Sequence, residues 1–148
     1  MTADDGSETV VIRRLIPVPR ERVFAAWLEP ASLAVWMCPG PVVSASAEVD
    51  ARVGGRFRIV MKHPNGDADH WGEYLAIDPP SKLSFSWMSQ ATDRQPTIVL
   101  VEFFDRGGDT EIVLTHRRLP PPQTEPHRKG WSDIVQKLGA TLASGSRA

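Results

Sequence analysis

Apolar and polar residues alternate along most of the chain between about residues 43 and 117. This is the period of β-strands with one buried and one exposed face. Phe57, Ile59 and Met61, for example, share one side of such a strand. Turn signals separate the runs, among them Asn65–Gly66 and the glycine pair at 107–108. The pattern predicts about six strands joined as antiparallel hairpins, after a first strand at residues 9–16.

Two short segments before this block have helical spacing instead. Val23, Phe24 and Trp27 fall three and four residues apart after Pro19, which suits an early helical position. Leu33 and Trp36 continue the spacing in a second segment, before prolines at 39 and 41 interrupt it. We therefore expect two short helices between the first strand and the rest of the sheet.

A longer apolar stripe lies near the C-terminus. It recurs at helical intervals and comprises Trp131, Ile134, Val135, Leu138 and Leu142. The proline-rich stretch 119–126 before it is expected to be a stiff linker, which places the start of the helix near Gly130. The stripe must bury against something, and the sheet is the partner available.

This order of elements predicts an α+β fold in which a curved antiparallel sheet wraps a long C-terminal helix. The 148 residues fit one domain. We expect this domain to span residues 9–143, with flexible tails at 1–8 and 144–148.

Charge and composition exclude several classes of partner. Seventeen basic residues against eighteen acidic ones give a net charge of -1, without a basic run that would hold nucleic acid or a membrane surface. The N-terminus lacks the pattern of a signal peptide, and the single cysteine, Cys38, cannot form an internal disulfide. No apolar stretch approaches the ~20 residues that span a bilayer. We expect a cytoplasmic protein that binds neither nucleic acid nor membrane.

A set of residues spread along the chain, most of them turn glycines and core aromatics, resembles the pattern of a known family. They are Arg14 through Pro19 leading into Val23–Phe24 and Ala26–Trp27, Pro30, Trp36, Gly54–Gly55 with Phe57, Gly72 with Tyr74, Thr110 with 114–116, and Gly130–Trp131. Over nearly the whole chain this set resembles the activator of heat-shock protein 90 ATPase-like family. The family belongs to the SRPBCC superfamily of START lipid-transfer domains, polyketide cyclases and the major birch-pollen allergen. The resemblance implies a helix-grip fold.

The resemblance also implies three possible functions. Stand-alone members resemble carriers that hold a small apolar or amphipathic molecule between sheet and helix, which is the function we expect. A minority of the superfamily catalyses cyclisation or hydrolysis in the same cavity. The eukaryotic namesake pairs this domain with a second chaperone-binding domain, which we do not find in this sequence, so a chaperone partner is a weaker alternative. A homodimer is left open, and no cofactor is expected.

A ligand cavity needs apolar walls with a few polar groups. The side chains that the alternation turns inward are Phe57, Ile59, Met61, Tyr74, Phe85, Trp87, Val99, Val101 and Phe103, joined from the helix by Trp131, Val135 and Leu138. The alternative is that they fill a solid core. Five tryptophans in a small domain are hard to interlock without voids, which favours a partial cavity.

Polar candidates are few. His116 falls on the inward face of its strand and is a candidate to orient a ligand or move a proton, unless it is a satisfied structural residue. Glu73 is a second catalytic candidate if its strand faces the other way. The cluster of His63, Asp67, Asp69 and His70 is explained by a polar turn, so we predict no metal site.

Overall fold

The computed structural model describes residues 7–145. Seven strands form one sheet in the order β1–β7–β6–β5–β4–β3–β2, and every neighbouring pair is antiparallel. The strands are β1 (Glu8–Ile16), β2 (Ser44–Val49), β3 (Arg56–His63), β4 (Gly66–Asp78), β5 (Lys82–Ser89), β6 (Thr97–Arg106) and β7 (Asp109–Leu119). The alternating pattern located the predicted strands, and it is clearest in β3 and β6, where buried residues alternate with more exposed ones.

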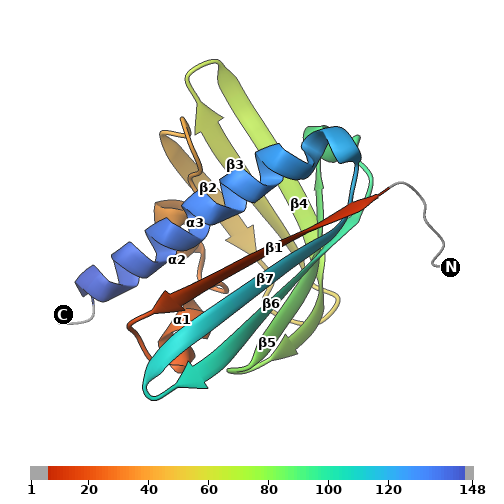
Figure 1. Cartoon of the computed structure of the whole chain (residues 1–148). Coiled ribbons are helices and arrows are strands. Elements are labelled where there is room, and N and C mark those ends of the chain that lie inside the picture. Colours follow the sequence, from red (N-terminus) through yellow and green to blue (C-terminus); the bar gives the residue numbers. More distant parts are fainter. Residues whose placement is uncertain (1–6, 146–148) are drawn as a thin grey trace, which may run out of the picture.

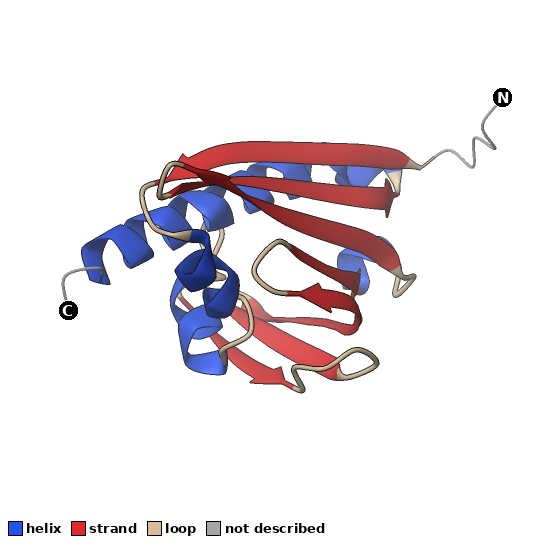
Figure 2. Cartoon of the chain, turned by 90° about the horizontal axis from the view of Figure 1, so that it is seen from below, coloured by secondary structure: helices blue, strands red, loops and turns tan. Residues whose placement is uncertain are grey.

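The sheet is strongly curved. Strands β1, β7 and β6 form one wall and β4, β3 and β2 the other, so the inner face is a trough (Figure 2). The long helix α3 (Thr124–Gly145) lies across this trough (Figure 1). These features are those of the predicted α+β helix-grip fold, which the structure confirms.

Two short helices, α1 (Arg20–Ala26) and α2 (Pro30–Trp36), follow β1. Proline precedes the first helix and opens the second, where its missing N–H costs no helical hydrogen bond. Trp27, at the end of α1, packs edge-on against Trp36 with ring centroids 4.8 Å apart. The two helices bury this apolar surface under one part of the trough, as the spacing of their apolar residues requires.

The helix α3 begins earlier than the sequence indicated. It starts at Thr124, directly after a 3₁₀ turn at Pro121–Gln123, so much of the expected proline-rich linker is helical. Pro126 is tolerated because the first helical turn has N–H groups without intrahelical partners. The Thr124 hydroxyl donates a hydrogen bond to Oε1 of Glu8, which joins the start of the helix to the start of β1.

The first and last described elements lie near the two termini of the chain. Strand β1 begins at Glu8 and α3 runs to Gly145, whereas most of the predicted tails, residues 1–6 and 146–148, lie outside the described residues. Within residues 7–145, no helix has the length and apolar character needed to span a membrane.

Candidate functional site between the sheet and the long helix

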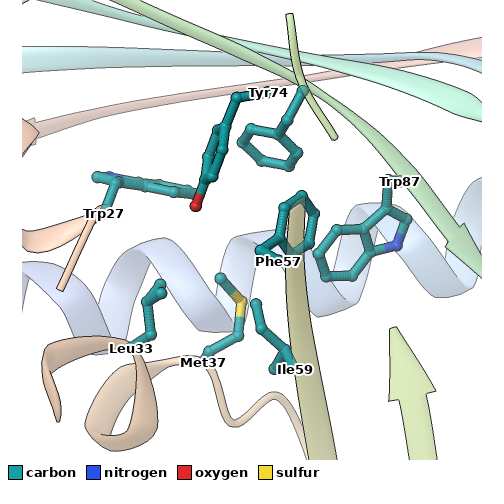
Figure 3. Close-up of a pocket in the computed structure, with 8 residues that line it drawn as sticks. Trp27, Leu33, Met37, Phe57, Ile59, Tyr74 and Trp87 are labelled. Atoms are coloured by element: carbon teal, nitrogen blue, oxygen red, sulfur yellow. The ribbon is translucent and has the colours of Figure 1, made fainter. Parts of the chain in front are cut away.

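The space between sheet and helices has a packed centre and an open end. The centre lies under α1 and α2 and contains a void of about 10 Å³. Such a void holds at most about one water molecule. The side chains around it are Trp27, Leu33, Met37, Phe57, Ile59, Tyr74, Phe85 and Trp87 (Figure 3).

Aromatic contacts account for the tight packing of the centre. Phe57 meets Phe85 edge-on with ring centroids 5.3 Å apart, and Tyr74 lies 5.5 Å from Phe57. Met37 inserts its thioether among these rings (Figure 3). A flexible thioether fills irregular gaps well. In this region the side chains form a solid core, which was the alternative to a cavity.

The open end is a cleft of about 270 Å³, which we call the end cleft. It lies between the first turns of α3, the β3–β4 hairpin and the end of β5. Its lining is mostly apolar and comprises Pro39, Met61, His63, Ala68, His70, Trp87, Ala91, Gln123, Pro126, His127, Gly130, Trp131 and Ile134. Its volume is close to the ~300–1,000 Å³ typical of small-molecule sites.

Two tryptophans form the apolar wall shared by sheet and helix. Trp87 of β5 and Trp131 of α3 have ring centroids 5.0 Å apart, and the exposed fractions of their side chains are 3% and 2%. Both line the end cleft, and Trp87 also lines the void in the centre. Trp87 is therefore the partition between the packed and the open region.

A chain of hydrogen bonds fixes this wall. The indole N–H of Trp131 donates to Nδ1 of His116 over 2.9 Å, so Nδ1 carries a lone pair. The proton of the neutral ring is then on Nε2, which donates to the Thr97 hydroxyl over 2.6 Å. Thr97 in turn donates to the backbone oxygen of Trp87 over 2.6 Å. The chain thus connects the two tryptophans.

His116 is committed to this structural role. Its side chain is fully buried, and burial lowers its pKa to about 3. Both ring nitrogens are occupied by Trp131 and Thr97, so neither is available to a ligand. The structure therefore does not place His116 as a catalytic group.

Glu73, the second catalytic candidate, does not face the interior either. It is exposed on the outer face of β4, and its backbone N–H donates to the Ser86 hydroxyl over 2.9 Å. Its neighbours Gly72 and Tyr74 occupy the buried positions of the strand, and the side chain of Tyr74 faces the interior. The alternation along β4 therefore excludes Glu73 from the cleft.

Three half-buried histidines line the end cleft: His63, His70 and His127. Burial lowers the pKa of His70 to about 4, although nearby backbone oxygens oppose the shift. Burial also lowers the pKa of His127, whose Nδ1 lies 2.9 Å from the Gln123 carbonyl. The rings of His70 and His127 are therefore neutral at pH 7. Among residues 7–145, no group of His, Cys, Asp and Glu is arranged to hold a metal ion.

Two buried indole N–H groups have no hydrogen-bond partner among the described residues, those of Trp27 and Trp87. Trp27 lines the void in the centre. The Trp87 nitrogen lies on the edge of the ring that faces away from Phe57 and Ile59 (Figure 3). A buried hydrogen-bond donor without a partner costs about 1–3 kcal/mol. Neighbouring core side chains do not offset this cost for Trp27 or Trp87, because none of them accepts a hydrogen bond from these N–H groups.

The predicted wall residues are divided between these regions. Met61, Trp87 and Trp131 line the end cleft. Those around the void in the centre are Phe57, Ile59, Tyr74, Phe85 and Trp87, whereas Val99, Val101, Phe103, His116, Val135 and Leu138 are buried and line neither space. Trp27 and Trp36 are buried in the core and do not line the cleft.

Sequence reasoning missed the polar part of the cleft. Gln123 lay in the stretch expected to be a linker, and His127 lay between that stretch and the expected start of the helix, so their side chains were not considered. His63 and His70 were noticed as a cluster but assigned to a polar turn. The signal in the sequence was the histidines themselves. His63 and His70 belong to the β3–β4 hairpin, which lies next to the start of the last helix, where His127 is located.

Comparisons with known proteins agree with this architecture. The family model described as "Activator of Hsp90 ATPase homolog 1-like protein" matches residues 17–143. Proteins from Mus musculus and Homo sapiens named "Activator of 90 kDa heat shock protein ATPase homolog 1" are each 27% identical over 105 residues, which is 70% of this chain. The matched part is 29% of each relative, so the chain spans less than a third of their length.

Solved structures share the fold at low sequence identity. A protein of unknown function from Staphylococcus aureus is 19% identical, with a TM-score of 0.83 over 99% of this chain and 100% of its own. A protein from Chromobacterium violaceum is 21% identical, with a TM-score of 0.80 over 90% and 96%. The AHSA1-like protein from Aeromonas hydrophila is 22% identical, with a TM-score of 0.77 over 94% of each chain.

Proposed function

The chain belongs to the activator of Hsp90 ATPase homolog 1-like family, and from its end cleft we propose that it binds a small apolar or amphipathic molecule there. The observation that carries this proposal is the cleft of about 270 Å³ walled by Trp87 and Trp131. Large aromatic side chains supply much of the apolar contact in ligand sites. The few polar groups at the rim would orient the ligand.

The packed centre is the less favourable place for a ligand. Its void of about 10 Å³ would have to grow at the expense of contacts among Phe57, Phe85 and Met37. Opening a close-packed core costs several kcal/mol. Binding at the end cleft requires no such rearrangement, which supports the cleft as the site.

Gly130 offers a direct test, because it lines the cleft from α3. A Cβ atom built at this position would meet nothing nearer than Cβ of Pro39 at 3.8 Å. Gly130→Leu therefore extends a side chain towards the cleft from an uncrowded Cβ position and introduces a good helix former. Ser132→Leu, two residues along and exposed, adds the same side chain outside the cleft and is the matched control.

The measurement is the dissociation constant of a naphthalene-sized probe, 2-naphthol, from calorimetric titration. We expect Gly130→Leu to weaken binding by about tenfold or more, which is ~1.4 kcal/mol, with the melting temperature kept. Ser132→Leu should bind as the wild type does. Equal affinity in all three proteins, or no binding to the wild type, would refute a ligand site in the end cleft.

A second candidate function is stimulation of a chaperone ATPase. The observation that favours it is the 27% identity to mouse and human proteins named as activators of the 90 kDa heat shock protein ATPase. The test adds the chain to a purified 90 kDa heat shock protein and measures ATP hydrolysis. A rate that rises and saturates with the chain would support this role, and an unchanged rate would remove it.

A further inference from the structure

We propose that the ligand of the end cleft is a neutral molecule that carries a hydroxyl group and donates this proton to Nε2 of His127. The inference rests on the function proposed above and specifies the chemistry of the ligand. It follows from three features: the hydrogen bond at the other nitrogen of this ring, the position of the ring in the cleft, and the charges of the lining.

The hydrogen bond of His127 fixes the role of its free nitrogen. Nδ1 lies 2.9 Å from the backbone oxygen of Gln123, one helical turn earlier. A carbonyl oxygen can only accept, so Nδ1 must carry the proton. In the neutral ring Nε2 is then a lone-pair acceptor, and the structure gives it no partner among the described residues. A ligand that pairs with Nε2 must therefore be a donor.

Because His127 lines the cleft and its Nδ1 is already paired, we infer that Nε2 is the nitrogen that meets a ligand. His127 lies in the first turns of α3 and lines the end cleft beside Trp131 and Gln123. Its face is held by the His116 ring, with centroids 5.2 Å apart in an edge-on arrangement. Since His116 is locked between Trp131 and Thr97, the His127 ring has a rigid support on that side. The acceptor is thus held in a fixed place.

The charges of the lining select against ions. None of the described residues that line the cleft is Lys, Arg, Asp or Glu. An ionised ligand would lose hydration in a mostly apolar cleft without an opposite charge, which is strongly unfavourable. Burial lowers the pKa of His70 and of His127, so these rings do not supply a positive charge at pH 7. A neutral hydroxyl fits this lining better than a carboxylate or an amine.

His63 and His70 are the other histidines that line the cleft, and they differ from His127. Nδ1 of His70 is buried without a hydrogen-bond partner, and His63 lies at the end of β3 beside the hairpin turn. Among the described residues, neither His63 nor His70 has a hydrogen bond at Nδ1 like the one that fixes the proton of His127. His127 is therefore the ring that the structure equips with a defined acceptor.

The experiment compares three probes of one ring system at pH 7: 2-naphthol, 2-methoxynaphthalene and 2-naphthoate. The first is a neutral donor, the second has the oxygen without the proton, and the third is an anion. We expect 2-naphthol to bind about fivefold tighter than 2-methoxynaphthalene, the value of one net hydrogen bond, and 2-naphthoate to bind more weakly than 2-naphthol.

Variants test whether His127 causes the tighter binding of 2-naphthol than of 2-methoxynaphthalene. In His127→Phe, which keeps a ring against His116, the ratio of the two dissociation constants should fall to about one, a change of roughly fivefold. His127→Gln, which restores a carbonyl acceptor, should recover part of the ratio and provides a second variant if the first fails to fold. His63→Phe, a change of the same kind in the same cleft, should leave the ratio unaltered.

The outcomes separate this inference from the function on which it rests. A ratio that persists in His127→Phe, or that is lost in His63→Phe, would overturn the assignment to His127. Equal binding of 2-naphthol and 2-methoxynaphthalene to the wild type would overturn the hydroxyl preference while leaving the end cleft as a binding site. Failure of all three probes to bind would overturn the proposed function and the inference with it.

Discussion

The packed centre and the end cleft are built on the same curved sheet and share Trp87, yet their free volumes are about 10 Å³ and about 270 Å³. The centre is filled because α1, α2 and the residue after α2 place Trp27, Leu33 and Met37 into the trough. The end cleft receives no such insertion, and small residues such as Gly130 and Ala68 face it.

The comparison between the packed centre and the end cleft shows how one sheet can contribute to stability in one region and form the proposed binding site in another. Side chains in the centre contact one another and contribute to folding through burial. Side chains at the end are fixed by neighbours outside the cleft, as Trp131 is by His116, and space remains beside them. The partition wall between the two regions is the feature that a mutation can test.

The largest effect is expected at Gly72, in the packed centre. A Cβ atom there would lie 1.9 Å from the backbone oxygen of Ser86 and 2.8 Å from the Phe57 ring. Gly72→Ala should therefore force β4 and β5 apart and lower the free energy of unfolding by about 3 kcal/mol or more. Urea denaturation measures the loss, and a change below about 1 kcal/mol would show that the centre is less tightly packed than the structure describes.

We expect acid to lower the free energy of unfolding through protonation of His116, which holds Trp131 in place. The unfolded chain takes up this proton near pH 6.5, whereas the folded protein does so near pH 3. Between these values the unfolded state binds more protons, so stability is complete above about pH 6.5 and falls as the pH is lowered towards 3. One such group accounts for roughly 2 kcal/mol between pH 6.5 and about pH 4.5.

The measurement is urea unfolding across this pH range in the wild type and in His116→Gln. The variant lacks the titrating ring, so its free energy of unfolding should fall less steeply with acid. Parallel pH profiles of the two proteins would contradict the buried, neutral state of His116. Carboxylates titrate in both proteins and cancel in the difference.

A smaller loss is expected when the hydrogen-bond chain is cut at Thr97. Thr97→Val keeps the shape of the side chain but leaves His116 Nε2–H and the Trp87 carbonyl without their partner. Unpaired buried polar groups cost about 1–3 kcal/mol, so we expect a loss of about 2 kcal/mol in urea denaturation. Thr115→Val, half-buried on the outer face of β7, is the matched control and should change stability little. Equal losses in both variants would argue against the chain.

The smallest change in stability is expected at Gly130 in the end cleft, and there the substitution should stabilise the protein. Gly130→Ala adds a methyl group with no atom closer than 3.8 Å and removes a flexible residue from a helix interior. Stability should rise by about 0.5–1 kcal/mol. Thermal unfolding beside Gly72→Ala compares the same substitution in the two regions. A loss of stability at Gly130 would mean that the cleft has no spare room.

The sequence was sufficient for the fold because the two periods of burial are visible in it. The alternation around Phe57 and Ile59 located β3, and the stripe through Trp131 and Leu138 identified the buried face of α3. The start of α3 was placed too late because prolines usually end helices, yet Pro126 occupies a first turn where proline is accepted.

The site was less predictable because it depends on packing between elements distant in sequence. Alternation showed that Phe57 and Met61 point inward, but whether free space remains beside each depends on the side chains that α1 and α2 insert. His116 pointed inward as expected, and its role as a bridge to Trp131 required the position of the helix. A homodimer and a cytoplasmic location stay predictions.

The most direct test of the central claim uses the five tryptophans as reporters. Indole N–H resonances are recorded by two-dimensional NMR while 2-naphthol is added. Binding in the end cleft should shift the signals of Trp87 and Trp131 and leave that of Trp36, fully buried on α2, in place. Shifts concentrated on Trp27 and Trp36, with Trp131 unchanged, would place the ligand in the packed centre and contradict the account.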